Sequence, residues 1–469
     1  RYTGAMTRPP GAGEEPADIF TEMLRLQGEA ARQIFATFAP QAVAAVPDRA
    51  ALDAMGAAML KFQEAWLGHS FLGKGAEPPA PPLADPAGWL EAMRAMVAGM
   101  PLLDPAAQQQ MLADGFALWQ QVIDEFAGKR APGETPQLPF ADRRFADPAW
   151  REQPVFALIH QTYLLFAERI AAAIDAPDGM GAQLGEAERA QLRFATRAVL
   201  DAMSPANFPL LNPVVLERTL ESGGHNLVKG MERLSADLER GQLTHTDTSQ
   251  FRIGENVAAT PGKVIFETPL FQLIHYTPVT EAVLATPVLI FPPWINRFYI
   301  LDLNPRKSFV RWAVEQGLSV FLVSWRSADE SLADVTFDDY VRAQITAIDV
   351  VRERLRVPAV HTVGYCVAGT TLAMTLAVLA RRGAADKVKS ATFLTAQVDF
   401  SHAGDLKLFV DEGKLAFIRQ ASQGGYFDGR YMAATFNLLR GSDLIWNTVV
   451  NHYLLGEDYP TFDMLFWNG

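Results

Sequence analysis

The residues VHTVGYCVAGTT, 360–371, indicate how this chain folds. An apolar, strand-like run leads into Cys366, and helix-forming residues follow at once. A nucleophile flanked by small residues two positions before and after it is typical of a nucleophile elbow, a strained turn between a strand and a helix. The small residues here are Gly364 and Ala368. Alanine stands where glycine is usual, and we expect the adjacent Gly369 to relieve the crowding.

The sequence around this turn alternates between strand-like and helix-like segments. Helical patterns separate several of the strand-like runs, which predicts parallel strands joined by right-handed crossovers in a doubly wound α/β core. No clear strand is expected after Leu394. The expected strands are Val264–Phe266, Pro287–Phe291, Ser319–Trp325, Ala359–Val363 and Ala391–Leu394, and the expected helices among them are Phe337–Leu355 and Thr370–Arg381.

Residues 362–380 carry no charge over 19 positions, which is close to the length that spans a bilayer. The glycines within this run suit a single long helix poorly. A buried strand, turn and helix would also be uncharged, because a parallel strand is covered on both faces. We therefore expect a buried strand–turn–helix and no transmembrane segment.

The first part of the chain, to about residue 200, has a helical pattern. Apolar residues between Phe20 and Phe38 recur at helical spacing, and two further helices are expected at Trp150–Ile174 and Glu186–Met203. Two proline clusters interrupt this part as extended connectors, at residues 78–86 and 132–148. The interpretation is a helical N-terminal domain at residues 1–215, an α/β core at 216–402 and a further region at 403–469.

Composition excludes several classes of protein. The formal charge of −12 argues against a general nucleic-acid binder. A single cysteine allows no intrachain disulfide, and the first residues contain no apolar signal-peptide core, so a cytoplasmic location is expected. No metal-ligand motif is present, and Gly179, Gly181 and Gly185 have the wrong spacing for a dinucleotide turn. His160 and His275 lie on apolar stretches and are expected to be core residues.

Cys366 is the candidate nucleophile, because a thiolate attacks thioesters readily and leaves readily in acyl exchange. The alternative is a buried cysteine that acts only as a small apolar side chain. In an elbow the backbone N–H of Val367 would donate to an oxyanion. The loop after the strand Pro287–Phe291 would supply the second donor near Ile295.

Several long motifs together resemble class I polyhydroxyalkanoate synthases, from about residue 150 onward. They are FPPWINRFYILDL (291–303), VFLVSWR (320–326), GYCVAGT (364–370), DLIWN (443–447), QLRFAT (191–196), ESGG (221–224) and FWNG (466–469). The resemblance implies an α/β-hydrolase fold and an enzyme that polymerises (R)-3-hydroxyacyl-CoA, releases CoA and needs no other cofactor. It also implies a cytoplasmic homodimer at the granule surface, which carries the growing polyester chain on Cys366.

The same resemblance assigns further residues. Arg440 matches an arginine near the CoA, with a surface ion pair as the equal alternative, and residues 403–469 match a cap over the active site. Trp467 is expected at a dimer contact. The triad Asp and His of the family follow the FWNG segment, so both are expected beyond Gly469, and the 469 residues alone are expected to be inactive. His402 and His452 are the weaker candidates for the base.

Two other functions stay open at this point. A cysteine hydrolase of the thioesterase or dienelactone-hydrolase type would share the elbow and admit water to the acyl-enzyme. A non-catalytic granule scaffold would use Cys366 as a core residue. The long helical half and the cap favour the synthase, since small hydrolases of this fold lack both. The GYCV elbow resembles the short-chain class, which suggests 3-hydroxybutyryl-CoA, although the acyl length does not follow from the residues.

Overall fold

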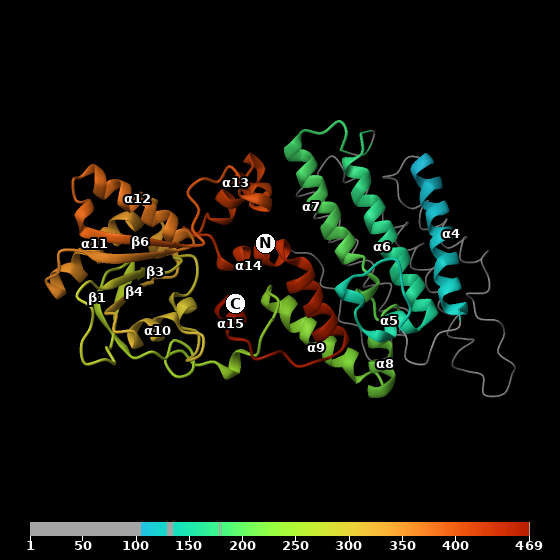
Figure 1. The fold of residues 1–469 in the computed structure, drawn as a ribbon, viewed down its shortest axis with the longest axis horizontal. Helices are drawn as coiled ribbons and strands as arrows, with labels where there is room; N and C mark the ends of the chain where they lie inside the picture. Colours follow the sequence, from blue (N-terminus) through green and yellow to red (C-terminus); the bar gives the residue numbers. More distant parts are fainter. Residues whose placement is uncertain (1–104, 129–134, 178, 180, 469) are drawn as a thin grey trace. The chain divides into compact units, whose positions relative to one another are not determined.

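The structure is a computed structural model that describes residues 105–128, 135–177, 179 and 181–468 (Figure 1). The chain divides into two compact units. The first contains Arg1–Ala236 and Arg440–Glu457, and the second contains Asp237–Leu439 and Asp458–Gly469. The expected helix at Phe20–Phe38 and the proline cluster at 78–86 lie outside the described residues. The division at residues 215 and 402 stays a prediction, and the contacts place Arg440–Glu457 with the first unit.

Helices form the described part of the first unit. Helix α6 packs against α4 on one side and α7 on the other, with apolar residues such as Val122, Leu165 and Phe166 in the core. The expected helix Trp150–Ile174 is two helices, because Gln153 is extended ahead of Pro154. The helices are α4 (Pro105–Ala127), α5 (Pro148–Glu152), α6 (Pro154–Asp175), α7 (Glu186–Ala202), α8 (Pro213–Ser222), α9 (His225–Arg240), which continues into the second unit, and the π-helical η10 (Ser442–Trp446) and η11 (Val449–Leu454).

His160 on α6 is a satisfied core residue, as the sequence predicted. Its ring is 2% exposed, and its Nδ1 donates to the Phe156 carbonyl at 2.9 Å. The other nitrogen, Nε2, accepts from Gln161 Nε2 at 2.9 Å. The donor on Nε2 requires the neutral ring, and burial lowers the pKa of His160 below its ordinary value.

A six-stranded sheet forms the centre of the second unit, in the order β1-β2-β4-β3-β5-β6. The pairs β1–β2 and β2–β4 are antiparallel, and β4–β3, β3–β5 and β5–β6 are parallel. The α/β core is therefore confirmed. The strands are β1 (Gly262–Glu267), β2 (Phe271–Tyr276), β3 (Val288–Phe291), β4 (Val320–Trp325), β5 (Val360–Tyr365) and β6 (Val388–Leu394).

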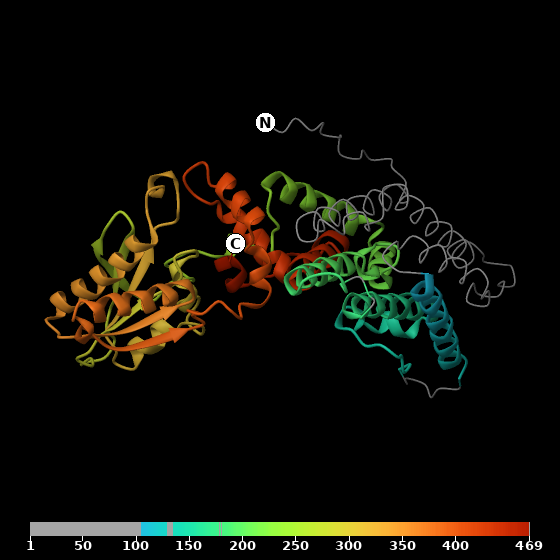
Figure 2. The ribbon, with the colours of Figure 1, turned by 90° about the horizontal axis from the view of Figure 1, so that it is seen from above.

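Helices cover both faces of this sheet. Helices α11 (Phe337–Leu355) and α12 (Val367–Arg381) pack on one face, where Leu289 and Phe321 join the core. Helix α10 (Phe309–Glu315) packs on the other face, against Ile290 and Leu322 (Figures 1 and 2). The buried central strands explain the apolar, uncharged sequences of β3 and β4.

Five of the six strands were predicted, and the uncharged run at 362–380 is a strand, a turn and a helix. In the described part of the chain no helix is long and apolar enough to cross a membrane. Strand β2 was missed; it contains His275, a half-buried residue whose ring stacks on Phe321 at 4.1 Å. Beyond Leu394 the described residues form no strand, as expected, but α13 (Glu412–Ala421), α14 (Gly429–Leu439) and α15 (Asp463–Asn468).

Candidate active site

Cys366 occupies a strained turn between β5 and α12. Its φ of 52° and ψ of −129° lie in a backbone region that residues other than glycine rarely adopt, and this conformation costs about 1–3 kcal/mol. Hydrogen bonds hold the turn on both sides: the Cys366 N–H donates to the Leu394 carbonyl at 2.9 Å, and the Cys366 carbonyl accepts from the N–H of Gly369 at 2.9 Å. The neighbouring strand β6 and the first turn of α12 therefore fix the conformation that a nucleophile elbow requires.

Strand and helix cross closely just behind this turn. A Cβ built on Gly364 would lie 2.6 Å from the Cα of Gly369, and one built on Gly369 would lie 2.7 Å from the Gly364 carbonyl oxygen. Ala368 is fully buried but has room for its methyl group, and its carbonyl accepts from Gln344 Nε2 at 3.0 Å. Gly369, one position after the small residue of the pattern, therefore has no room for a side chain.

The segment after β3 lies beside the elbow at the carboxyl edge of the sheet. Phe291, the last residue of β3, is paired with Gly364 of β5, so the following segment Pro292–Arg297 leaves the sheet next to Cys366. Ligands of open α/β sheets bind in the crevice outside this edge. Ile295, the expected source of the second oxyanion donor, lies in this segment and is 44% exposed.

Three indole N–H groups hold that segment. Trp325 Nε1 donates to the Pro292 carbonyl at 2.8 Å, and Trp467 Nε1 donates to the Arg297 carbonyl at 2.8 Å. Trp294, within the segment, donates to Thr371 Oγ1 of α12 at 3.2 Å. None of these bonds could be assigned from the sequence. The dimer contact expected for Trp467 stays a prediction.

The thiol of Cys366 is half-buried and free. Among the described residues its sulfur has no hydrogen-bond partner, so no histidine is poised to take its proton. His402 is exposed in a turn, and His452 belongs to the first unit, where its Nδ1 donates to the Glu457 carbonyl at 2.9 Å. His361 on β5 is bonded to Ser390 Oγ at 2.6 Å. A base for Cys366 is therefore not assembled in this part of the structure.

Arg440 lies in the first unit and forms a surface ion pair with Asp443. Arg143 contacts the other carboxylate oxygen of Asp443. The hydrogen bond from Arg440 and the nearby Arg143 lower the pKa of Asp443. The ion pair with Asp443 is the alternative that the sequence left open for Arg440. A role for Arg440 at CoA stays a prediction.

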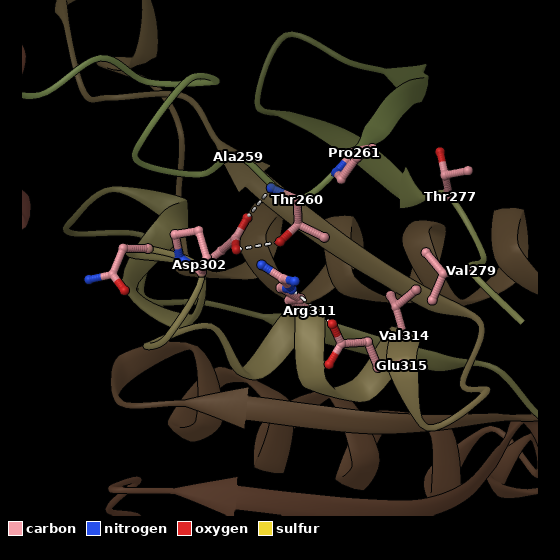
Figure 3. Close-up of a pocket in the computed structure, with 11 residues that line it drawn as sticks. Ala259, Thr260, Pro261, Thr277, Val279, Asp302, Arg311, Val314 and Glu315 are labelled. Atoms are coloured by element: carbon pink, nitrogen blue, oxygen red, sulfur yellow. Dashed lines mark hydrogen bonds and ion pairs between the residues drawn. The ribbon is translucent and has the colours of Figure 1, made fainter.

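A separate cavity of about 270 Å³ lies between α10 and the segments that precede β1 and follow β2 (Figure 3). Two pairs of its polar residues bond to each other: Thr260 Oγ1 donates to Asp302 Oδ1 at 2.6 Å, and Arg311 Nε donates to Glu315 Oε1 at 2.8 Å. None of the described residues that line it belongs to the elbow or to the segment after β3. This cavity is therefore distinct from the candidate site at Cys366.

Comparison with known proteins identifies relatives along most of the chain. A family model described as "Poly-beta-hydroxybutyrate polymerase (PhaC) N-terminus" matches residues 141–313. The chain is 46% identical over 367 residues to a poly(3-hydroxyalkanoate) polymerase of Methylorubrum extorquens, and the aligned region covers 77% of this chain and 60% of that protein. The poly(3-hydroxyalkanoate) polymerase subunit PhaC of Rhizobium meliloti (strain 1021) is 41% identical over 414 residues, or 87% of this chain and 67% of that protein. The PhaC subunit of Cupriavidus necator is 42% identical over 415 residues, or 82% and 68%. The matches thus span 60–68% of the length of these relatives.

Proposed function

The chain belongs to the poly(3-hydroxyalkanoate) polymerase family, and we propose that it provides the nucleophile of such a polymerase. The enzyme would convert (R)-3-hydroxyacyl-CoA into polyester and release CoA. The observation that carries the proposal is the position of Cys366: a cysteine held at positive φ between a parallel strand and a helix, at the carboxyl edge of the sheet.

The proposed chemistry is acyl transfer through sulfur. The Cys366 thiolate attacks the thioester carbonyl carbon, a carbon–sulfur bond forms, and the carbonyl electron pair moves to oxygen. The oxyanion collapses, breaks the bond to the CoA sulfur and releases CoA thiolate, which takes up a proton. The hydroxyl of another hydroxyacyl unit then attacks the acyl-enzyme, which lengthens the ester chain and frees the sulfur.

Backbone N–H groups would stabilise the oxyanion. Val367 is the first residue of α12, and the first N–H groups of a helix have no partner inside it. The second donor is assigned to the segment after β3, at Ile295. The thiol proton requires a base, which we assign to a histidine other than the described ones, because none of these is bonded to Cys366. General-base help is worth roughly two to four orders of magnitude in rate.

The finer features of the family are part of the same proposal. They are an α/β-hydrolase fold, a cap at 403–469, a cytoplasmic homodimer at the granule surface, and a preference for 3-hydroxybutyryl-CoA with no cofactor apart from the CoA of the substrate. The six-stranded sheet, parallel from β4 to β6 with helices on both faces, supports the fold assignment.

The test uses the full-length protein that contains these residues. With 3-hydroxybutyryl-CoA, we expect CoA release, measured as free thiol, together with polymer. Cys366→Ala should abolish CoA release and leave the fold intact, and Cys366→Ser should keep at most a trace, since a hydroxyl is the weaker nucleophile. Normal CoA release by Cys366→Ala would refute the mechanism. Free hydroxyacid as the only product would instead indicate the cysteine hydrolase, and a thiol inert to small reagents would indicate the scaffold.

A further inference from the structure

The segment Pro292–Arg297 is fastened at both ends and in its middle. The N–H groups of Trp325 and Trp467 each bond one of its backbone carbonyls, at Pro292 and Arg297. The indole of Trp294 extends from the middle of the segment to α12. An indole nitrogen only donates, so each of these bonds has a fixed direction and a fixed partner. The segment is therefore held as a rigid strip beside the elbow.

The bond from Trp294 continues to the elbow itself. Trp294 Nε1 donates to Thr371 Oγ1 at 3.2 Å, and Thr371 Oγ1 donates to the Val367 carbonyl at 2.9 Å. Thr371 is fully buried, and the Trp294 ring stacks on Tyr340 at 4.7 Å, which restricts its rotation. The segment after β3 and the first turn of α12 are thereby joined through one hydroxyl group.

These two segments are the ones assigned to supply the oxyanion donors. An oxyanion hole works only when both N–H groups point at one oxygen position, and removing one donor costs about 10²–10³ in rate. A displacement of about 1 Å can cost roughly 10²-fold. A tie between the two segments would set the spacing of the donors before the substrate binds.

We infer that Trp294 and Thr371 are positioning residues for the acyl-transfer step. They act through the segment at Ile295 and the turn at Val367, and they contact no reacting atom. This inference rests on the proposed function, since it assumes that Cys366 is acylated.

The test compares variants of the full-length protein that alter the tie with little change in volume. Trp294→Phe removes the N–H and keeps an aromatic ring. Thr371→Val removes the hydroxyl and keeps the shape of the side chain, whereas Thr371→Ser keeps the hydroxyl. Trp312→Phe is the matched control, because Trp312 is 52% exposed on α10. With 3-hydroxybutyryl-CoA, Trp294→Phe and Thr371→Val should each lower kcat roughly 10- to 100-fold with KM within about twofold. Thr371→Ser and Trp312→Phe should stay within about threefold of the unaltered protein.

A second reaction at the same sulfur separates positioning from a general loss of structure. Alkylation of Cys366 by iodoacetamide forms a carbon–sulfur bond and expels iodide without an oxyanion. The alkylation rate should therefore be unchanged in Trp294→Phe and Thr371→Val. The double variant should be no slower in acyl transfer than the slower single variant, because both changes remove one interaction.

The outcomes are distinct. If the unaltered protein shows Cys366-dependent CoA release and both single variants retain its kcat, the positioning role is wrong and the proposed function stands. The role is equally wrong if alkylation slows as much as acyl transfer does, because the change then lies in the thiol or in the fold. If the unaltered protein releases no CoA at all, the proposed function itself fails.

Discussion

A methyl group added at Gly364 should disrupt the crossing of β5 and α12. The new Cβ would lie 2.6 Å from the Gly369 Cα, and both are backbone-attached atoms that no side-chain rotation can separate. Carbon atoms in favourable contact lie about 3.5–4.0 Å apart, so strand and helix would have to separate by about 1 Å. Overpacking of this kind costs about 1–3 kcal/mol, and a rigid backbone contact belongs at the upper end of that range.

The control is the same substitution where space is open. Gly429, at the start of α14, has no atom within 4 Å of an added Cβ, and its φ is not positive. Gly429→Ala should be neutral or should stabilise by about 0.5–1 kcal/mol, because alanine loses less chain entropy in a helix. We therefore expect the two variants to differ by about 3 kcal/mol in the free energy of unfolding.

A third variant tests where the crowding lies. Ala368→Gly should destabilise by about 1–2 kcal/mol, through a poorer helix former and a lost buried methyl group. If Ala368 were instead the crowded position, this change would stabilise. Urea unfolding followed by tryptophan fluorescence would rank the variants by their midpoints. Equal midpoints for Gly364→Ala and Gly429→Ala would refute the close crossing.

Three further outcomes are expected. Residues 1–469 expressed alone should release CoA no faster than their own Cys366→Ala variant, because no described histidine is bonded to the thiol; Cys366-dependent turnover would require a base within these residues, and mutation of His402 and His452 in turn would identify it. The full-length protein should sediment as a monomer–dimer mixture that substrate shifts towards dimer, whereas a strict monomer with full activity would count against the proposed homodimer. Burial lowers the pKa of His160 from its ordinary 6.5 in the folded state, so the unfolded chain binds the proton more readily. The contribution of the neutral His160 ring to stability should therefore be fully present above pH 6.5 and decrease as the pH drops below it. A His160→Gln variant with the same acid sensitivity would contradict this cause.

Local patterns predicted most of the α/β core, because the signals involved span only a few residues. The apolar runs of β3, β4 and β5 are buried on both faces, and such runs are recognisable without their partners. Strand β2 was missed because its sequence, FQLIHY, mixes polar and apolar residues in a pattern set by its antiparallel neighbours β1 and β4. An antiparallel strand of this kind depends on its pairing for its burial, and the pairing is not visible in a short window.

A short stretch of sequence was enough to locate Cys366 but not the residues proposed to position its oxyanion. Cys366 could be located from the sequence because the elbow needs small residues at fixed spacing along one continuous segment. Trp294 and Thr371 are separated by 77 positions and meet only because β3 and β5 are adjacent in the sheet, although β4 lies between them in the chain. The register that pairs Phe291 with Gly364 then brings the two loops to the same edge. A tryptophan and a threonine at that separation carry no motif of their own, so their role follows from strand order and register, which a single sequence does not contain.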